Sequence, residues 1–114
     1  GVAPLIAALR EKALGVHDEA MRKIENKLPG LTEREMHIIR KTTKGIVNQL
    51  MHDPIVRLKE LAAGRKGEDV LDIFAELFAL EEILARSEQE SVWAKEKNRQ
   101  QSTSPEAVLL SHKR

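Results

Sequence analysis

The sequence predicts an all-α fold, a small helical bundle that forms a dimer. Apolar residues recur at spacings of three and four, the period of an amphipathic helix, and no stretch alternates like a β-strand. Proline, glycine and a capping pattern divide this periodic sequence into segments. The 114 residues include three aromatic ones, so aliphatic side chains must supply nearly all of the core. A chain of this length buries a modest core, which a second copy would enlarge.

The first predicted helix spans residues 4–27. Pro4 suits a first helical turn, where its missing N–H costs nothing. One face is apolar at helical spacing and is formed by Ile6, Leu9, Ala13, Val16, Ala20 and Ile24. The helix is expected to end at Leu28-Pro29-Gly30, because helix is disfavoured before proline and glycine permits a turn.

A second helix is predicted from Thr32 to about His52. Thr32 and Glu35 have the spacing of a capping box, in which the hydroxyl and the carboxylate each bond a free N–H of the first turn. The apolar face that follows consists of Met36, Ile39, Thr43, Ile46, Val47 and Leu50. Asp53-Pro54 has the pattern of an N-cap followed by a proline in the first turn. A short third helix is therefore expected to start there at a changed angle.

A fourth helix is predicted from about Glu68, with apolar residues continuing to Leu84. Its apolar side chains cover more than half of the circumference, which is typical of a helix buried on two sides. They are Val70, Leu71, Ile73, Phe74, Leu77, Phe78 and Leu80. Residues 1–86 are therefore predicted to form the helical domain, and residues 87–114 a polar, flexible C-terminal tail.

The composition argues against several kinds of chemistry. Cysteine is absent, which excludes disulfides, thiolate nucleophiles and cysteine-ligated zinc. The four histidines, His17, His37, His52 and His112, lack the spacing that places two metal ligands on one helical face. With no nucleotide-binding loop or nucleophile motif either, no catalytic, cofactor-binding or metal-binding residue is expected in this segment. No apolar run approaches the ~20 residues of a membrane span, and a cytoplasmic protein is expected.

Two neighbouring regions carry opposite charge. Residues 34–66 hold eight basic and three acidic residues, whereas residues 68–96 hold nine acidic and two basic ones. Complementary faces, within one chain or across a dimer, are the favoured explanation. The alternative is that Arg40, Lys41 and Lys44, on the polar side of the second helix, contact the phosphates of an RNA.

The segment 46–54 carries a resemblance to a known family. Its sequence, Ile-Val-Asn-Gln-Leu-Met-His-Asp-Pro, resembles the Ile-Val-Asn-Lys-Leu-Leu-His-Asp-Pro motif in the C-terminal domain of glutamyl-tRNA reductase. Further matches in the same order are Leu9-Arg10-Glu11-Lys12-Ala13, Lys27-Leu28-Pro29, Leu31-Thr32, Glu33-Arg34-Glu35, Thr42-Thr43, Leu58-Lys59-Glu60 and Phe78-Ala79-Leu80-Glu81-Glu82. The resemblance covers residues 2–84, with departures at Gly45, Gln49 and Met51.

The resemblance implies that the chain is the dimerisation domain of a larger enzyme, with residues 1–27 as the end of a long connecting helix. Such enzymes use NADPH to reduce glutamyl-tRNA to glutamate-1-semialdehyde in tetrapyrrole (porphyrin) biosynthesis, through a cysteine thioester. This chain has neither that cysteine nor a nucleotide-binding loop, so both functions would belong to other domains. The implied partners are a second copy of the chain and, through the parent enzyme, glutamyl-tRNA; no membrane is expected.

Eight residues are the candidates for the dimer interface or the monomer core, because they line the broadest apolar faces. They are Ile39, Thr43, Ile46, Val47 and Leu50 of the second helix and Phe74, Leu77 and Phe78 of the fourth. Two such faces exceed what one small bundle can cover. The sequence does not tell which of the eight residues belong to the interface and which to the core of one copy.

Overall fold

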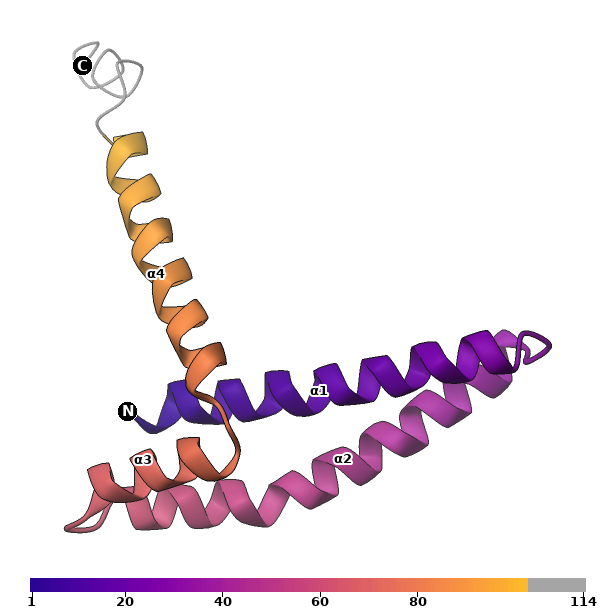
Figure 1. Cartoon of the computed structure of the whole chain (residues 1–114), viewed down its shortest axis with the longest axis horizontal. Coiled ribbons are helices and arrows are strands. Elements are labelled where there is room, and N and C mark those ends of the chain that lie inside the picture. Colours follow the sequence, from indigo (N-terminus) through magenta and orange to yellow (C-terminus); the bar gives the residue numbers. More distant parts are fainter. Residues whose placement is uncertain (103–114) are drawn as a thin grey trace, which may run out of the picture. The chain divides into compact units, whose positions relative to one another are not determined.

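A computed structural model describes residues 1–102, and within them the chain is all-α, as predicted. Four helices follow one another: α1 (Val2–Lys27), α2 (Glu33–Ala62), α3 (Gly67–Leu77) and α4 (Glu81–Ser102) (Figure 1). The chain divides into two compact units, residues 1–81 and the part that begins at Glu82, and each is described by itself.

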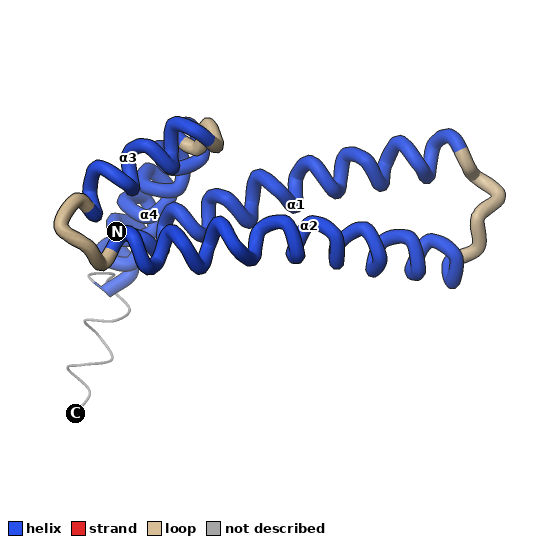
Figure 2. Tube along the Cα trace, turned by 90° about the horizontal axis from the view of Figure 1, so that it is seen from below, coloured by secondary structure: helices blue, strands red, loops and turns tan. Residues whose placement is uncertain are grey.

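Helices α1 and α2 form a long hairpin. They lie side by side and are joined at one end by residues 28–32 (Figure 2). The predicted capping box is present: Glu35 N–H donates to Thr32 Oγ1 at 3.1 Å, and Thr32 N–H donates to Glu35 Oε1 at 2.9 Å. Hydrogen bonding by Thr32 to the Glu35 carboxylate, from its backbone N–H first and from its side chain second, lowers the pKa of Glu35 because it favours the ionised form.

The predicted break at Asp53-Pro54 is wrong, because α2 continues through Pro54 to Ala62. A proline inside a helix removes one hydrogen bond and costs ~3 kcal/mol or more. Here the helix is held on both sides of the proline by burial of Met51 before it and of Ile55 and Leu58 after it. Figure 1 shows α2 bending part-way along, as proline commonly causes.

Helix α3 turns back along the C-terminal part of α2. The reversal requires a glycine at position 67, since a Cβ there would lie 2.2 Å from the carbonyl oxygen of Ala62. Within residues 1–81, α3 contacts both α2 and α1 at the end of the hairpin away from the 28–32 loop (Figures 1 and 2).

The sequence predicted continuous apolar helix to Leu84, but α3 ends at Leu77 and α4 begins at Glu81. The two terminal bonds of a Schellman motif close α3: Leu80 N–H donates to Ala75 O at 2.8 Å, and Ala79 N–H donates to Glu76 O at 3.1 Å. Ala79 takes the left-handed conformation (φ 53°) that glycine normally supplies at this position. This turn brings Leu80 into the core, where it is fully buried.

The core lies among α1, α2 and α3. Its buried apolar side chains are Leu5, Ala8, Leu9, Met21, Met51, Ile55, Leu58, Phe74, Ala75 and Leu80. Most of them lie where all three helices meet.

Helix α4 is highly exposed along residues 85–101. Residues 87–102, predicted as a flexible polar segment, are helical in the structure. Residues 103–114 of the predicted tail lie outside the described residues, and the domain boundary at residue 86 stays a prediction.

Candidate self-association surface

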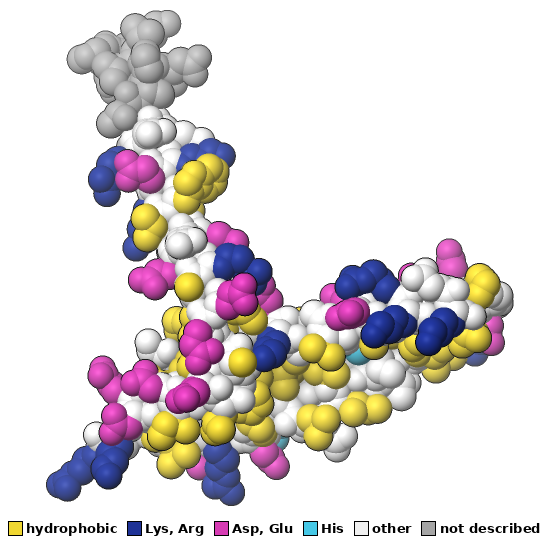
Figure 3. All heavy atoms as spheres, viewed as in Figure 1, with side chains coloured by type: hydrophobic (Ala, Val, Ile, Leu, Met, Phe, Trp, Pro, Cys, Tyr) yellow, Lys and Arg dark blue, Asp and Glu magenta, His cyan; other side chains and the backbone are white. Residues whose placement is uncertain are grey.

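A single copy of residues 1–81 leaves many large apolar side chains in solvent. They are Val16, Leu28, Ile38, Ile46, Leu50, Val56, Leu61, Ile73 and Leu77. The most exposed are Leu77, at 77%, and Leu50, at 73%. Figure 3 shows hydrophobic side chains gathered where α1, α2 and α3 adjoin. An apolar surface of this kind on a small domain marks an interaction site.

The hairpin explains why these side chains stay uncovered. Helix α3 covers one end only, so the part formed by residues 15–45 is two helices thick (Figure 2). Two helices alone enclose no interior, and in this part only His17 and Met21 are buried. Ile38 stays exposed and Ile39 half-buried.

An apolar groove of about 310 Å³ lies between α1, α2 and Phe78. Val16 and Leu50 form part of its lining from the two helices of the hairpin, and Pro54 continues it along α2. Phe78 forms the third side of the groove, and Lys12 Nζ of α1 donates to its carbonyl oxygen at 2.5 Å, at the C-terminal end of α3. A cation at this position is also stabilised by the negative end of the α3 dipole.

The structure separates the eight predicted interface or core residues into three groups. One, Phe74, is buried, and its ring lies 4.7 Å from that of Phe78, centroid to centroid. The half-buried ones are Ile39, Thr43, Val47 and Phe78. The exposed ones are Ile46, Leu50 and Leu77. The last group has the area free to meet a partner, whereas Phe74 belongs to the core of one copy.

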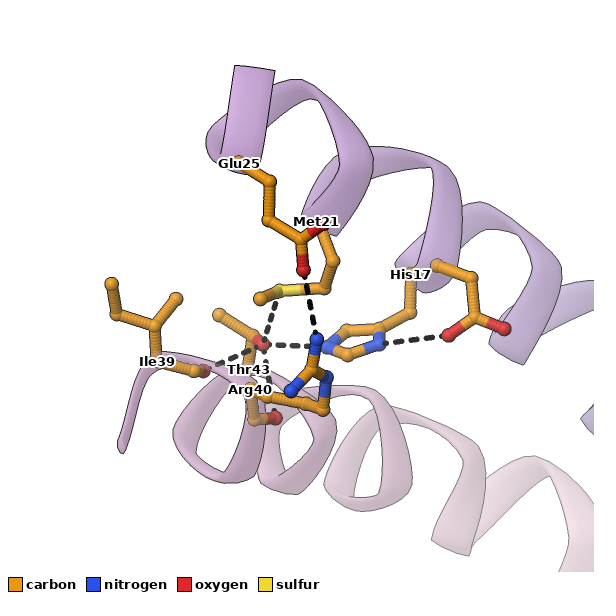
Figure 4. Close-up of polar contacts among 7 residues, drawn as sticks. His17, Met21, Glu25, Ile39, Arg40 and Thr43 are labelled. Carbon is orange, nitrogen blue, oxygen red and sulfur yellow. Dashed lines mark hydrogen bonds and ion pairs between the residues drawn. The ribbon is translucent and has the colours of Figure 1, made fainter. Parts of the chain in front are cut away.

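Thr43 bonds the two helices of the hairpin together (Figure 4). Its Oγ1 lies 2.8 Å from the carbonyl oxygen of Ile39 and 2.6 Å from His17 Nε2. The hydroxyl has one proton, which it donates to the carbonyl, so His17 Nε2 donates to the hydroxyl. His17 is 4% exposed, and its Nδ1 has no hydrogen-bond partner, the nearest carboxylate oxygen being that of Asp18 at 3.7 Å.

The sequence did not single out His17 for this role. Its signal was the spacing Ala13, His17, Met21, Ile24, which places the imidazole on the inner side of α1 among apolar residues. A buried histidine at such a position needs a polar group on the facing helix, and Thr43 is that group.

The basic residues proposed for RNA contact have different surroundings. Arg40 is paired with Glu25 of α1, Nη2 to Oε1 3.1 Å, and so is compensated within the hairpin rather than by the acidic segment 68–96 (Figure 4). Lys41 and Lys44 are exposed on α2. Neither a metal-binding group of three or more His, Asp or Glu side chains nor a helix long and apolar enough to cross a bilayer occurs in residues 1–102.

The family model described as "Glutamyl-tRNAGlu reductase, dimerisation domain" matches residues 1–80. The chain belongs to this family. The match covers α1 to α3, with the core and the exposed apolar surface, and ends before α4.

The relatives that this dimerisation domain resembles are glutamyl-tRNA reductases. It is 73% identical over 111 residues to a glutamyl-tRNA reductase of Brevibacillus brevis, covering 97% of this chain and 24% of the relative. Against that of Halalkalibacterium halodurans it is 58% identical over 90 residues, 79% of this chain and 20% of the relative. It is 45% identical over 97 residues to the glutamyl-tRNA reductase of Bacillus subtilis, which covers 85% of this chain and 21% of the relative. The chain thus spans about a quarter or less of these relatives. No solved structure matches it.

Proposed function

We propose that this domain joins two copies of a glutamyl-tRNA reductase into a homodimer through the exposed apolar surface of α2 and α3, centred on Leu50 and Leu77. The observation that carries the proposal is the exposure of Leu50 and Leu77, which one copy leaves 73% and 77% in solvent. The neighbouring two-helix part of the hairpin also leaves apolar side chains such as Val16 and Ile38 exposed. A second hairpin laid against it would complete a four-helix arrangement with an interior. Full burial of one leucine contributes about 1.5–3 kcal/mol, so a few such residues suffice for stable pairing.

The parent enzyme, on this proposal, reduces glutamyl-tRNA to glutamate-1-semialdehyde with NADPH, on the route to tetrapyrroles in the cytoplasm. Its catalytic cysteine and its NADPH site lie in other domains, and this segment contributes no catalytic, cofactor-binding or metal-binding residue. The absence of cysteine from the chain supports this division, since a thioester mechanism needs a thiol. The role of this domain is to hold two catalytic halves in one assembly.

Sedimentation equilibrium on the full 114-residue chain tests the homodimer. Wild type should be dimeric at tens of micromolar, and Leu50→Asp should raise the dissociation constant at least about 100-fold. Both copies contribute residue 50 to a twofold interface, so the dimer loses the burial of two leucines and must remove two aspartates from water. Gln49→Asp is the matched control, because this neighbouring side chain is also exposed but is polar. A monomeric wild type, or equal effects of both variants, would refute the proposal.

A contact between the domain and glutamyl-tRNA is a second proposal. It is favoured by Lys41 and Lys44, two exposed cations three residues apart on α2, whereas Arg40 is engaged with Glu25. The test is filter binding of tRNA to the full-length enzyme at several salt concentrations. Lys41→Gln with Lys44→Gln should weaken binding and flatten its salt dependence. Unchanged binding and slope would dispose of this contact.

A further inference from the structure

Helix α4 carries a pair of large apolar side chains at its midpoint. Val92 and Trp93 are 62% and 65% exposed, and α4 extends about ten residues on either side of them. Lys97 lies over the indole, 5.1 Å from its centroid, but leaves it largely in solvent. Figure 3 shows the hydrophobic side chains of α4 set among charged ones. The family match ends before this helix, so its pattern needs its own explanation.

The face that contains Val92 has the spacing of a helix-pairing seam. Ala85, Gln89, Val92 and Glu96 follow one another at steps of four, three and four, and they line one continuous surface with Trp93 at its edge. This alternation keeps one narrow stripe facing a partner helix along its length. The seam is weakly apolar, so burial of apolar area alone would hold a partner weakly and a second interaction is needed.

The distribution of charge along α4 supplies this second interaction. Residues 81–91 hold four glutamates and one arginine, a net charge of −3, and residues 92–102 hold three basic residues and one glutamate, a net charge of +2. In a parallel pair of two such helices, acid would face acid and base would face base. In an antiparallel pair each acidic half meets a basic half, which is the favourable arrangement.

The helix's own electrostatics do not explain this polarity. The helix dipole favours acidic residues in the first turn and basic ones in the last, and its effect ends there. Pairing within the helix joins charges three or four residues apart. Glu88 and Lys95 lie in the middle turns and have no residue of opposite charge at those spacings. A second helix of opposite direction would bring the acidic half of α4 beside a basic half.

We infer that α4 pairs antiparallel with α4 of a second copy of this chain, about a twofold axis beside Val92. The two Val92 side chains meet at the centre, and the acidic half of each helix lies along the basic half of the other. The inference rests on the proposed homodimer in one respect: a seam this short is weak alone, and copies already joined through residues 1–81 present their α4 helices to each other at high effective concentration.

Cysteine cross-linking of the full chain tests the pairing. The chain has no cysteine, so Val92→Cys introduces a sole thiol at the proposed axis, where the Cα atoms come within the roughly 7 Å that a disulfide spans. Ala94→Cys is the matched control, because position 94 lies on the opposite face of the same helix. Under mild oxidation Val92→Cys should form the linked dimer at least about ten times faster. Equal rates would overturn the inference.

The direction of the pair needs a second measurement. In a mixture of Gln89→Cys and Glu96→Cys chains, an antiparallel pair links position 89 of one copy to position 96 of the other. Links between identical positions are disfavoured, because seven residues of helix offset them by about 10 Å. A parallel pair gives the reverse result and would overturn the inference. The sole tryptophan, Trp93, gives an independent readout, since pairing should shift its emission to shorter wavelength.

Sedimentation of the same chains separates this inference from the homodimer. A dimeric chain in which positions 92 and 94 cross-link equally keeps the proposed function and refutes pairing through α4. A chain that is monomeric in sedimentation but cross-links selectively at position 92 supports pairing through α4 and refutes the interface on α2 and α3.

Discussion

Replacing Thr43 by valine should destabilise the domain through a residue on the other helix. Valine keeps the shape and the β-branching of threonine but removes the hydroxyl that accepts from His17 Nε2 at 2.6 Å. His17 is nearly fully buried, and its other nitrogen already lacks a hydrogen-bond partner. The substitution therefore leaves a buried imidazole with no hydrogen bond at all.

The expected cost follows from that desolvated N–H group. A buried donor that loses its partner costs roughly 1–3 kcal/mol, and a domain of this size loses about 4–8 °C in melting temperature for each kcal/mol. Removing both partners, in Thr43→Val with His17→Leu, leaves no unpaired imidazole and should restore much of the loss. The two substitutions should therefore be non-additive by about 1–2 kcal/mol.

Urea and thermal unfolding at one fixed chain concentration measure both effects, because association with a second copy would otherwise shift the midpoints. Thr42→Val is the matched control: it makes the same chemical change at an exposed neighbouring position and should stay within about 0.5 kcal/mol of wild type. If Thr43→Val is as stable as Thr42→Val, or if the double variant is additive, the hydrogen bond to His17 does not hold the hairpin.

Three further predictions concern the fold. Leu58→Ala should cost about 2–5 kcal/mol in urea unfolding, because the side chain is fully buried between helices. Thr32→Ala should lower the free energy of unfolding by about 1 kcal/mol, because it removes the side chain that caps α2. Wild type should be more stable than Glu35→Ala at neutral pH, and this difference should shrink as the pH falls through the lowered pKa of Glu35, because the cap needs the ionised carboxylate. Gly67→Ala should lower the melting temperature by driving a Cβ against backbone, whereas Gly45→Ala, with open space around it, should raise it; the opposite order would contradict the packing described.

Local signals in the sequence predicted the first half of the fold. The first helix, the Pro29-Gly30 turn and the Thr32–Glu35 capping box follow from short-range features, and all three are confirmed. The apolar face predicted for that helix is confirmed in part only, because Leu9 is buried whereas Val16 is exposed. The errors came where packing between distant segments decides. Pro54 carries a local break signal that burial of Ile55 and Leu58 overrides.

The end of α3 and the length of α4 escaped prediction for opposite reasons. No glycine marks the turn after Leu77; Ala79 takes a left-handed conformation there, and Leu80 becomes fully buried. Helix α4 has little apolar periodicity, but its Glu, Lys, Gln, Arg and Ala residues are strong helix formers, a signal that composition alone could have supplied.

The interface candidates were predicted as a set but could not be divided. Ile46, Val47 and Leu50 occupy one side of α2, and the sequence gives no means to tell them apart. Only the position of α1 makes Val47 half-buried while Ile46 and Leu50 stay exposed. Which residues of an amphipathic face meet solvent depends on where the neighbouring helix lies, which is not a local property.

The polar contacts of the hairpin connect its stability to its association. In the two-helix part, residues 15–45, little apolar area is buried, and polar bonds join the helices instead: His17 to Thr43, and Arg40 to Glu25. A hairpin fixed in this way before it meets its partner loses less conformational entropy on binding. Thr43→Val should therefore weaken the dimer as well as the fold, although Thr43 is half-buried within its own copy. Leu58→Ala, buried where α2 meets the rest of the core, should weaken the fold while leaving the dissociation constant of the folded chain close to that of wild type. Sedimentation of both variants under native conditions compares the two, and equal dissociation constants would show that the polar bonds do not preorganise the interface.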